Sequence, residues 1–315
     1  MTTPILIDTD MAIDDWLAIL YLLRHPQADV RAITVAATGE AHARPGERNA
    51  RRLLALARHP SIPTRAGSPF PLVGRRVFPL IIRLMMDACL FLRLPAPLKA
   101  VSTGQNALDV IVQTLQACAD PVTIVALGPL TNLAQALQQQ PQLAEKIGGI
   151  FIMGGALQVP GNLASVNPAL RANTHAEWNI YIDPQAANIV FGCGAPVTLV
   201  PLDATNQVPL TAGLLAKLAG QARHPAAKFS HQALARIFRL SNGREFYFWD
   251  PLAAAAALQP ELLQLETRLV RVIEDDGSEC GRVIESPAGY PIHVAFGADA
   301  QAFERVYLEI LGRDD

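Results

Sequence analysis

Acidic side chains gather near the start of the sequence. Asp8, Asp10, Asp14 and Asp15 follow one another closely, with an apolar run before them and Trp16 after them. Carboxylates this close repel one another strongly at low dielectric, and a bound cation is the simplest way to stabilise them. An oxygen-only ligand set favours Ca²⁺ or Mg²⁺ over zinc. The alternative is an acidic helix start, in which Asp14 and Asp15 only complement the helix dipole.

A second acidic position follows an aromatic run late in the chain. Asp250 comes after Phe246-Tyr247-Phe248-Trp249 and precedes Pro251 and an alanine-rich segment. One interpretation is an N-cap with proline in the first helical turn. The aromatic run is either buried core or a stacking wall for a flat ligand.

A third polar group lies around Trp178. Glu177 and Asn179 flank this tryptophan, so in an extended segment both polar side chains face the same way. Such a pair can present an acceptor and an amide to hydroxyl groups. A polar surface edge is the alternative.

The surrounding sequence alternates between strand-like and helix-like patterns. Apolar strand-like runs cover 5–7, 30–35, 122–126, 150–152, 197–200 and 293–296, and helical patterns cover 16–23, 47–57, 106–118, 130–137 and 300–311. We therefore expect an α/β protein with a single open, mostly parallel sheet covered by helices. Asp10 would lie where the first strand ends, and ligands of open α/β sheets collect at the carboxyl ends of strands.

No domain boundary is visible, so we predict one domain over residues 1–315. Two irregular insertions interrupt it, at about 67–100 and 160–174, and both are rich in proline. Such insertions are often binding loops or lids, and simple disorder is the alternative. The segment from Asn206 to about Leu240 has a helical, alanine- and leucine-rich composition.

Composition excludes several classes of protein. Of the 315 residues, 50% are hydrophobic and 17% charged, which excludes intrinsic disorder. A net charge of −2 gives no basic footprint, so we expect neither nucleic acid nor a membrane surface as a partner. The four cysteines are far apart and form no CxxC pair. With no secretory signal visible and charges breaking the apolar region 79–98, we expect a cytoplasmic protein.

Taken together, these segments resemble the inosine–uridine-preferring nucleoside hydrolases along nearly the whole chain. The family opens with an apolar strand followed by D-x-D-P-G-x-D-D, matched here by residues 8–15. The other matching motifs, in the family's order, are Leu127-Gly128-Pro129-Leu130-Thr131-Asn132-Leu133-Ala134, Ile152-Met153-Gly154-Gly155, Glu177-Trp178-Asn179 with Asp183-Pro184, and Trp249-Asp250-Pro251-Leu252-Ala253.

The resemblance implies a calcium-dependent hydrolysis of the N-glycosidic bond of ribonucleosides. By position, the protein ligands of the Ca²⁺ would be Asp10, Asp15, Asp250 and the carbonyl of Leu127. The ribose 2′- and 3′-hydroxyls and a water would complete the shell. Asp10 would be the general base for that water.

The remaining positions would bind the substrate. The resemblance assigns Asp14 and Asn179 to the 2′- and 3′-hydroxyls and Glu177 and Asn162 to the 5′-hydroxyl, and it adds Met153 to the pocket. Bond cleavage develops oxocarbenium character at the sugar, so an aligned nucleophile and a fixed ring supply much of the rate.

Departures from the family pattern bear on specificity. Trp249 occupies the place where one branch of the family has a histidine that protonates the leaving base, which an indole cannot do. The purine-specific branch also has Trp before this Asp, which favours purine nucleosides, with Trp249 stacking on the base and Phe78 or Tyr247 as the opposite face. Glu40 stands where many members have Asn, and this chain carries other residues in place of Pro-Gly after Asp10.

Two other functions stay open. A haloacid-dehalogenase-type phosphatase would use Asp8-Thr9-Asp10 with Mg²⁺, but a lysine and paired-Asp motif is not evident in the expected order, and Asp250 is left unexplained. A non-catalytic ribose- or nucleoside-binding protein would keep the pocket without turnover. The resemblance also implies a homodimer or homotetramer.

Overall fold

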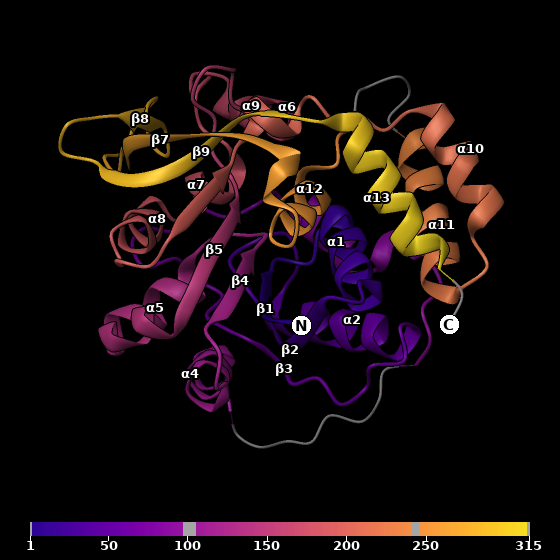
Figure 1. Cartoon of the computed structure of the whole chain (residues 1–315). Helices are drawn as coiled ribbons and strands as arrows, with labels where there is room; N and C mark the ends of the chain where they lie inside the picture. Colours follow the sequence, from indigo (N-terminus) through magenta and orange to yellow (C-terminus); the bar gives the residue numbers. More distant parts are fainter. Residues whose placement is uncertain (1, 97–104, 241–245, 314–315) are drawn as a thin grey trace.

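One mixed sheet forms the centre of the molecule (Figure 1). The computed structural model describes residues 2–96, 105–240 and 246–313. Within them the strand order is β3-β2-β1-β4-β5-β6-β9-β7-β8. The strands are β1 (Thr3–Thr9), β2 (Ala28–Val35), β3 (Thr64–Ala66), β4 (Val122–Ala126), β5 (Ile147–Met153), β6 (Val197–Val200), β7 (Leu263–Val272), β8 (Val283–Glu285) and β9 (Tyr290–Ala298). Among the described strands the antiparallel pairings are β7 with β8 and β7 with β9, and the other pairings are parallel, so the predicted open, mostly parallel α/β sheet is confirmed.

Helices cover both faces of the sheet (Figure 1). On one face α1 packs against α2, α11, α12 and α13, and on the other α5 packs against α4 and α8. Alternate residues of β1 serve the two faces, because Ile5 and Ile7 join one apolar core while Leu6 joins the other. The bounds are α1 (Ile13–Arg24), α2 (Ala43–Leu56), α4 (Ala107–Ala117), α5 (Thr131–Gln139), α8 (Pro184–Phe191), α11 (Pro225–Leu240), α12 (Trp249–Ala256) and α13 (Ala300–Gly312).

Some elements differ from the sequence prediction. The segment 206–240, expected to be helical, contains α10 (Ala212–Gln221) and α11, but its first residues are not helical, and α9 (Leu202–Thr205) ends before it. Pro209 pairs with Tyr247 in a β-bridge, and Thr211 caps α10. Strands β3, β7 and β8 were not predicted. β3 and β8 are each three residues long, and β7 has several exposed residues, so none of the three carries a clear apolar pattern.

Both irregular insertions contain short helices. The first includes α3 (Leu80–Asp87) and a 3₁₀ turn (Cys89–Phe91), while its residues 97–100 lie outside the described part of the chain. The second includes α6 (Leu163–Val166) and a 3₁₀ turn (Pro168–Leu170). In the described ranges, none of the helices combines the length and the apolar character needed to cross a bilayer.

The strand order reverses at β1. This strand lies between β2 and β4, so the connections leaving β1 and β4 diverge to opposite faces and leave a crevice at the carboxyl ends of the strands. Asp10 immediately follows β1, and Leu127 immediately follows β4. The fold therefore opens a crevice where the acidic motif was expected.

Candidate active site

A pocket at the carboxyl ends of β1, β4 and β5 contains the residues predicted to bind metal or substrate, with the exception of Tyr247. Its lining comprises Asp10, Ala12, Asp14, Asp15, Glu40, Phe78, Leu127, Met153, Asn162, Ser165, Val166, Glu177, Trp178, Asn179, Trp249 and Asp250. Ala12, Ser165, Val166 and Trp178 were not predicted as site residues. Of these, Ala12 and Trp178 lay inside recognised motifs, whereas Ser165 and Val166 carry no chemical signal.

Carboxylates from opposite ends of the chain meet on the pocket floor. Asp14, Asp15 and Asp250 each place an oxygen within 4.8 Å of the others. The meeting is produced by packing, because α1, which carries the first two, lies against α12, which carries the third. Asp250 is the second residue of α12 rather than its N-cap, so the simple capping interpretation is wrong.

The oxygens of this cluster can hold a metal ion. Asp15 Oδ1 accepts hydrogen bonds from Thr9 Oγ1 and from the Asp10 amide, whereas its buried Oδ2 has no hydrogen-bond partner among the described residues. A buried carboxylate oxygen without a donor is costly unless a cation compensates it. The described pocket lining contains no lysine, arginine or histidine. The donor set therefore fits a hard cation.

Asp10 is held differently from its neighbours. Its Oδ1 accepts from the Ala12 amide at 3.2 Å and its Oδ2 from the Glu40 amide at 3.1 Å. Gly39 and Gly128 enclose it from two sides, since a Cβ on either would lie 2.2 or 2.7 Å from Asp10 Cβ. The backbone thus fixes this carboxylate tightly beside the cluster, and the oxygens grouped with Asp15 and Asp250 belong to Asp14 rather than to Asp10.

Burial and mutual repulsion make these groups harder to ionise. Burial, opposed by backbone hydrogen bonds, raises the pKa of Asp14 to about 6, and burial with the charge of Asp14 raises the pKa of Asp15 to about 7. Burial and the neighbouring carboxylates hold the pKa of Asp10 and of Asp250 well above the ordinary range. Burial likewise raises the pKa of Glu40, whose charge lies near Asp10. A cation would reverse these shifts.

Asp8 does not belong to the cluster, although the sequence grouped it there. Its Oδ1 accepts from Thr34 Oγ1 at 2.6 Å and from Asn132 Nδ2 at 2.8 Å. Asp183 is satisfied in the same way, by Thr131 Oγ1 at 2.7 Å and the Leu72 amide at 2.8 Å. The recognised motifs around Asn132 and Asp183 therefore stabilise the fold behind the pocket.

Glu177 and Asn179 reach the pocket by a route other than the extended one expected. Glu177 is the N-cap of α7 (Trp178–Ile182), where its carboxylate accepts from the amides of Asn179, Ile180 and Gly155 at 2.9, 3.2 and 2.9 Å. The prediction of alternating side chains is wrong because a capping carboxylate turns back onto its own helix. Both side chains nevertheless line the pocket.

Amide groups fix the remaining wall. Asn179 Nδ2 donates to the carbonyls of Leu127 and Met153 at 3.3 and 3.1 Å, which leaves the Asn179 carbonyl oxygen as its other polar atom. Asn162 Oδ1 accepts from the Trp178 amide at 3.1 Å. The Leu127 carbonyl, expected as a metal ligand, thus lies against Asn179 at the pocket edge.

Aromatic rings form two separate groups at the pocket. Phe78 stacks on Trp178 with centroids 4.6 Å apart and an interplanar angle of 25°. Tyr247 meets Trp249 at 61° with centroids 5.7 Å apart, so these rings touch and a base cannot lie between them. Tyr247 as the face opposite Trp249 is therefore wrong. The Trp249 Nε1 is buried and has no hydrogen-bond partner among the described residues.

Met11 gives the loop after β1 a shape that proline cannot adopt. Its φ is 64°, in the left-handed region, whereas proline is fixed near −65°. The Met11 amide donates to Thr9 Oγ1 at 3.0 Å, and its carbonyl accepts from Trp16 Nε1 at 2.9 Å. The replacement of Pro-Gly therefore changes the backbone and leaves the carboxylates in place.

Comparison with known proteins identifies the family. The family model described as inosine-uridine preferring nucleoside hydrolase matches residues 5–305. The chain belongs to this family. It is therefore an enzyme that hydrolyses N-glycosidic bonds.

Individual relatives differ in the base they are named for. A pyrimidine-specific ribonucleoside hydrolase, RihA, of Salmonella paratyphi C is 35% identical over 280 residues, covering 86% of this chain and 85% of the relative. The solved plant nucleoside hydrolase PpNRh1 superposes with a TM-score of 0.86 at 31% identity, with full coverage of both chains. A purine-preferring ribonucleoside hydrolase from Gardnerella vaginalis gives a TM-score of 0.80 at 26% identity and 98% coverage of both.

Proposed function

We propose that this chain is a Ca²⁺-dependent ribonucleoside hydrolase that releases free base and ribose, with purine nucleosides preferred. The observation that carries the proposal is the meeting of Asp14, Asp15 and Asp250 beside a rigidly held Asp10. Such an arrangement fits a hard cation next to a carboxylate that can accept a proton without moving. When bound, the ion would lower the pKa of a water and hold the vicinal diol of the ribose.

In this proposal the residues of the chain divide the work. Asp10, Asp15, Asp250 and the Leu127 carbonyl would hold the Ca²⁺, and Asp10 would accept the proton of the attacking water. The backbone amides of Ala12 and Glu40 fix the Asp10 oxygens, so this proton acceptor needs little reorganisation during the reaction.

Sugar hydroxyls would be bound around the rim of the cluster. Asp14 and the Asn179 side-chain oxygen would accept from the 2′- and 3′-hydroxyls, while Glu177 and Asn162 would bind the 5′-hydroxyl, with Met153 as wall. The three amides on Glu177 and the Trp178 amide on Asn162 hold these side chains in place before substrate arrives. Positioning of this kind supplies rate by removing orientational freedom.

The preference for purines rests on Trp249. The Trp249 indole lines the pocket where one branch of the family has a histidine that protonates the leaving base. Departure of the base would therefore depend on its stacking against the indole, which favours the larger ring of a purine. Phe78, already stacked on Trp178, would be the aromatic surface nearest the base on the other side.

A panel of nucleosides tests the whole proposal. Inosine, adenosine, guanosine, uridine and cytidine are incubated with the enzyme, with chelator and after Ca²⁺ is restored, and free base and ribose are measured. We expect base release from purines, loss with chelator and recovery with Ca²⁺ but not with Mg²⁺. Uridine and cytidine hydrolysed far better than inosine would contradict the purine preference alone.

The same assay separates the alternatives. Phosphate release from a phosphomonoester would favour the phosphatase, and nucleoside binding without free base would favour a binding protein. Asp120→Ala, an exposed substitution outside the pocket, is the matched control for Asp10→Ala, which should abolish turnover. We also propose that the enzyme has a single domain, is cytoplasmic and forms a homodimer or homotetramer. Light scattering at several protein concentrations would test the oligomeric state.

A further inference from the structure

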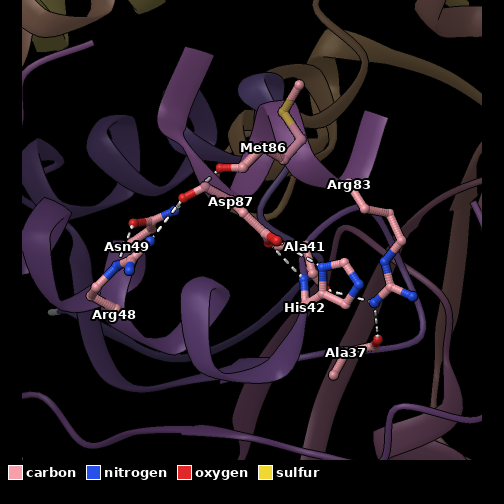
Figure 2. Close-up of polar contacts among 8 residues, drawn as sticks. All are labelled: Ala37, Ala41, His42, Arg48, Asn49, Arg83, Met86 and Asp87. Atoms are coloured by element: carbon pink, nitrogen blue, oxygen red, sulfur yellow. Dashed lines mark hydrogen bonds and ion pairs between the residues drawn. The ribbon is translucent and has the colours of Figure 1, made fainter. Parts of the chain in front are cut away.

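Arg83 is a buried cation in the first irregular insertion. It lies in the middle of α3 and is only 7% exposed. Its Nη2 donates to two backbone carbonyls, of Ala37 at 2.7 Å and Ala41 at 3.1 Å (Figure 2). Among the described residues, no carboxylate lies within ion-pair distance of it. One guanidinium nitrogen thus links the carbonyls at the two ends of the turn at 37–41, and hydrogen bonds from a charged donor are stronger than neutral ones.

That turn is the segment that holds Asp10. The Glu40 amide donates to Asp10 Oδ2 at 3.1 Å, and the Ala41 amide donates to the Asp10 carbonyl at 3.0 Å. Ala41 thus bonds to Arg83 through its carbonyl and to Asp10 through its amide. The turn also brings Gly39 so close to Asp10 that no Cβ fits between them. A small shift of the turn would therefore move the Asp10 carboxylate.

The end of α3 provides a second attachment. Asp87, its last residue, accepts from the His42 amide at 2.9 Å, and its other oxygen lies 2.7 Å from His42 Nδ1 (Figure 2). At the other end, Phe78 precedes α3 by two residues and lines the pocket against Trp178. One short helix therefore joins the aromatic wall to the turn that holds the acidic floor.

We propose that Arg83 is a positioning residue for the Asp10 carboxylate, acting through the carbonyls of Ala37 and Ala41. The inference deepens the proposed function and rests on it, because it gives the irregular insertion a role in placing the proton acceptor. Asp87 supports the same turn from its far side.

The test compares Arg83→Met with Arg48→Met. Arg48 also bonds to α3, donating to the Asp87 carbonyl at 2.8 Å, but it has no contact with the turn at 37–41 among the described residues. We expect Arg83→Met to lower kcat by about 100-fold with a smaller change in KM, since a misplaced proton acceptor slows chemistry more than binding. Arg48→Met should leave both constants unchanged, and Arg83→Lys, which keeps a charged donor, should recover most of kcat.

Calcium titration by calorimetry gives a readout without turnover. Arg83→Met should weaken Ca²⁺ binding by about 10-fold, the usual effect of removing a support behind a metal ligand. In an Asp10→Ala background it should weaken binding no further. Thermal melting checks that each variant folds. If Arg83→Met does not fold, Asp87→Ala tests the same turn. We then expect smaller decreases in kcat and in Ca²⁺ affinity.

The outcomes separate the two proposals. The role of Arg83 would be overturned if Arg83→Met and Asp87→Ala had the same kcat and Ca²⁺ affinity as Arg48→Met. The proposed hydrolase function would not be affected by that result. An equal loss of Ca²⁺ affinity with and without the Asp10 side chain would also overturn it. A wild-type chain that releases no base would end the proposed function, and the calcium titrations would still decide the role of Arg83.

Discussion

Two groups of buried carboxylates lie around β1, and they differ in the hydrogen-bond donors that reach their oxygens. Behind the pocket, Asp8 and Asp183 receive hydrogen bonds from Thr34, Asn132 and Thr131. In the pocket, Asp15 Oδ2 receives none, and the nearest charges are other carboxylates. The pocket acids also accept hydrogen bonds, Asp10 from two backbone amides and Glu177 from three, but a buried carboxylate oxygen that no donor reaches, such as Asp15 Oδ2, is available to a ligand. The difference predicts opposite consequences for substitutions that look alike.

The sharpest contrast is between Asp10→Asn and Asp8→Asn. We expect Asp10→Asn to lower kcat by at least about 100-fold, because an amide cannot accept the proton of the attacking water. Stability should also fall modestly, because asparagine keeps an acceptor for only one of the Ala12 and Glu40 amides. Asp8→Asn keeps an acceptor for Thr34 and Asn132, so kcat should stay within a few-fold while stability falls by about 1 kcal/mol. Steady-state kinetics and urea unfolding measure the pair, and equal kcat losses would remove the distinction.

The response of stability to pH should also separate the two groups. Burial raises the pKa of Asp14 to about 6 and of Asp15 to about 7 in the folded chain, above the ordinary value near 4. Without metal, stability is therefore greatest below that ordinary value and is lost as pH rises through 6 and 7. We expect the melting temperature of the metal-free protein to fall between pH 5 and pH 8. Added Ca²⁺ should raise it strongly at pH 8 and weakly at pH 5, where protons compete with the ion.

Asp250→Asn is the control for this experiment. It removes one charge from the cluster, so the metal-free protein should lose less stability between pH 5 and pH 8. Ca²⁺ should then stabilise it less. A pH dependence unchanged by Asp250→Asn would place its origin outside the pocket.

Substitution of Trp249 tests which residue of the pocket determines the preference for the base. Trp249→His supplies a proton donor for the leaving base and removes the stacking surface. We expect the ratio of kcat/KM for inosine to that for uridine to fall by about 10-fold or more. Phe238→Leu, an exposed aromatic substitution away from the pocket, should leave the ratio unchanged. A ratio that rises in Trp249→His would contradict the stacking role.

The smallest expected effect concerns Met11. Met11→Ala and Met11→Gly remove the same buried packing, and they differ in how easily the residue adopts a φ of 64°. We expect the glycine variant to be more stable than the alanine variant by about 1 kcal/mol. Urea unfolding of the two proteins measures this difference. Equal stabilities would mean that the left-handed turn carries no strain.

Several features of the site could be predicted from local sequence. Asp10 was expected at the end of the first strand, and β1 ends at Thr9. Asp14 and Asp15 were expected at a helix start, and α1 begins at Ile13. These predictions hold because apolar periodicity and strand length depend on neighbouring residues.

Other features depend on contacts between distant segments. Local patterns could not separate Asp8 from its neighbours, because the donors to it, Thr34 and Asn132, come from β2 and α5. Arg83 carried no signal, since an arginine in an irregular segment is normally exposed. Its burial follows from the packing of α3 on the turn at 37–41.

By itself the sequence determined the alternation of strands and helices, the acidic composition of the motif after β1 and the order of the family's motifs. These follow from side-chain chemistry and short-range spacing. Only the tertiary structure decided which carboxylates share the pocket, because α12 brings Asp250 to Asp15 across 235 residues of chain, while hydrogen-bond donors from other elements take Asp8 out of the set. The physical reason is that burial and donor supply, which decide whether an acid is structural or available, are properties of packing rather than of residue type.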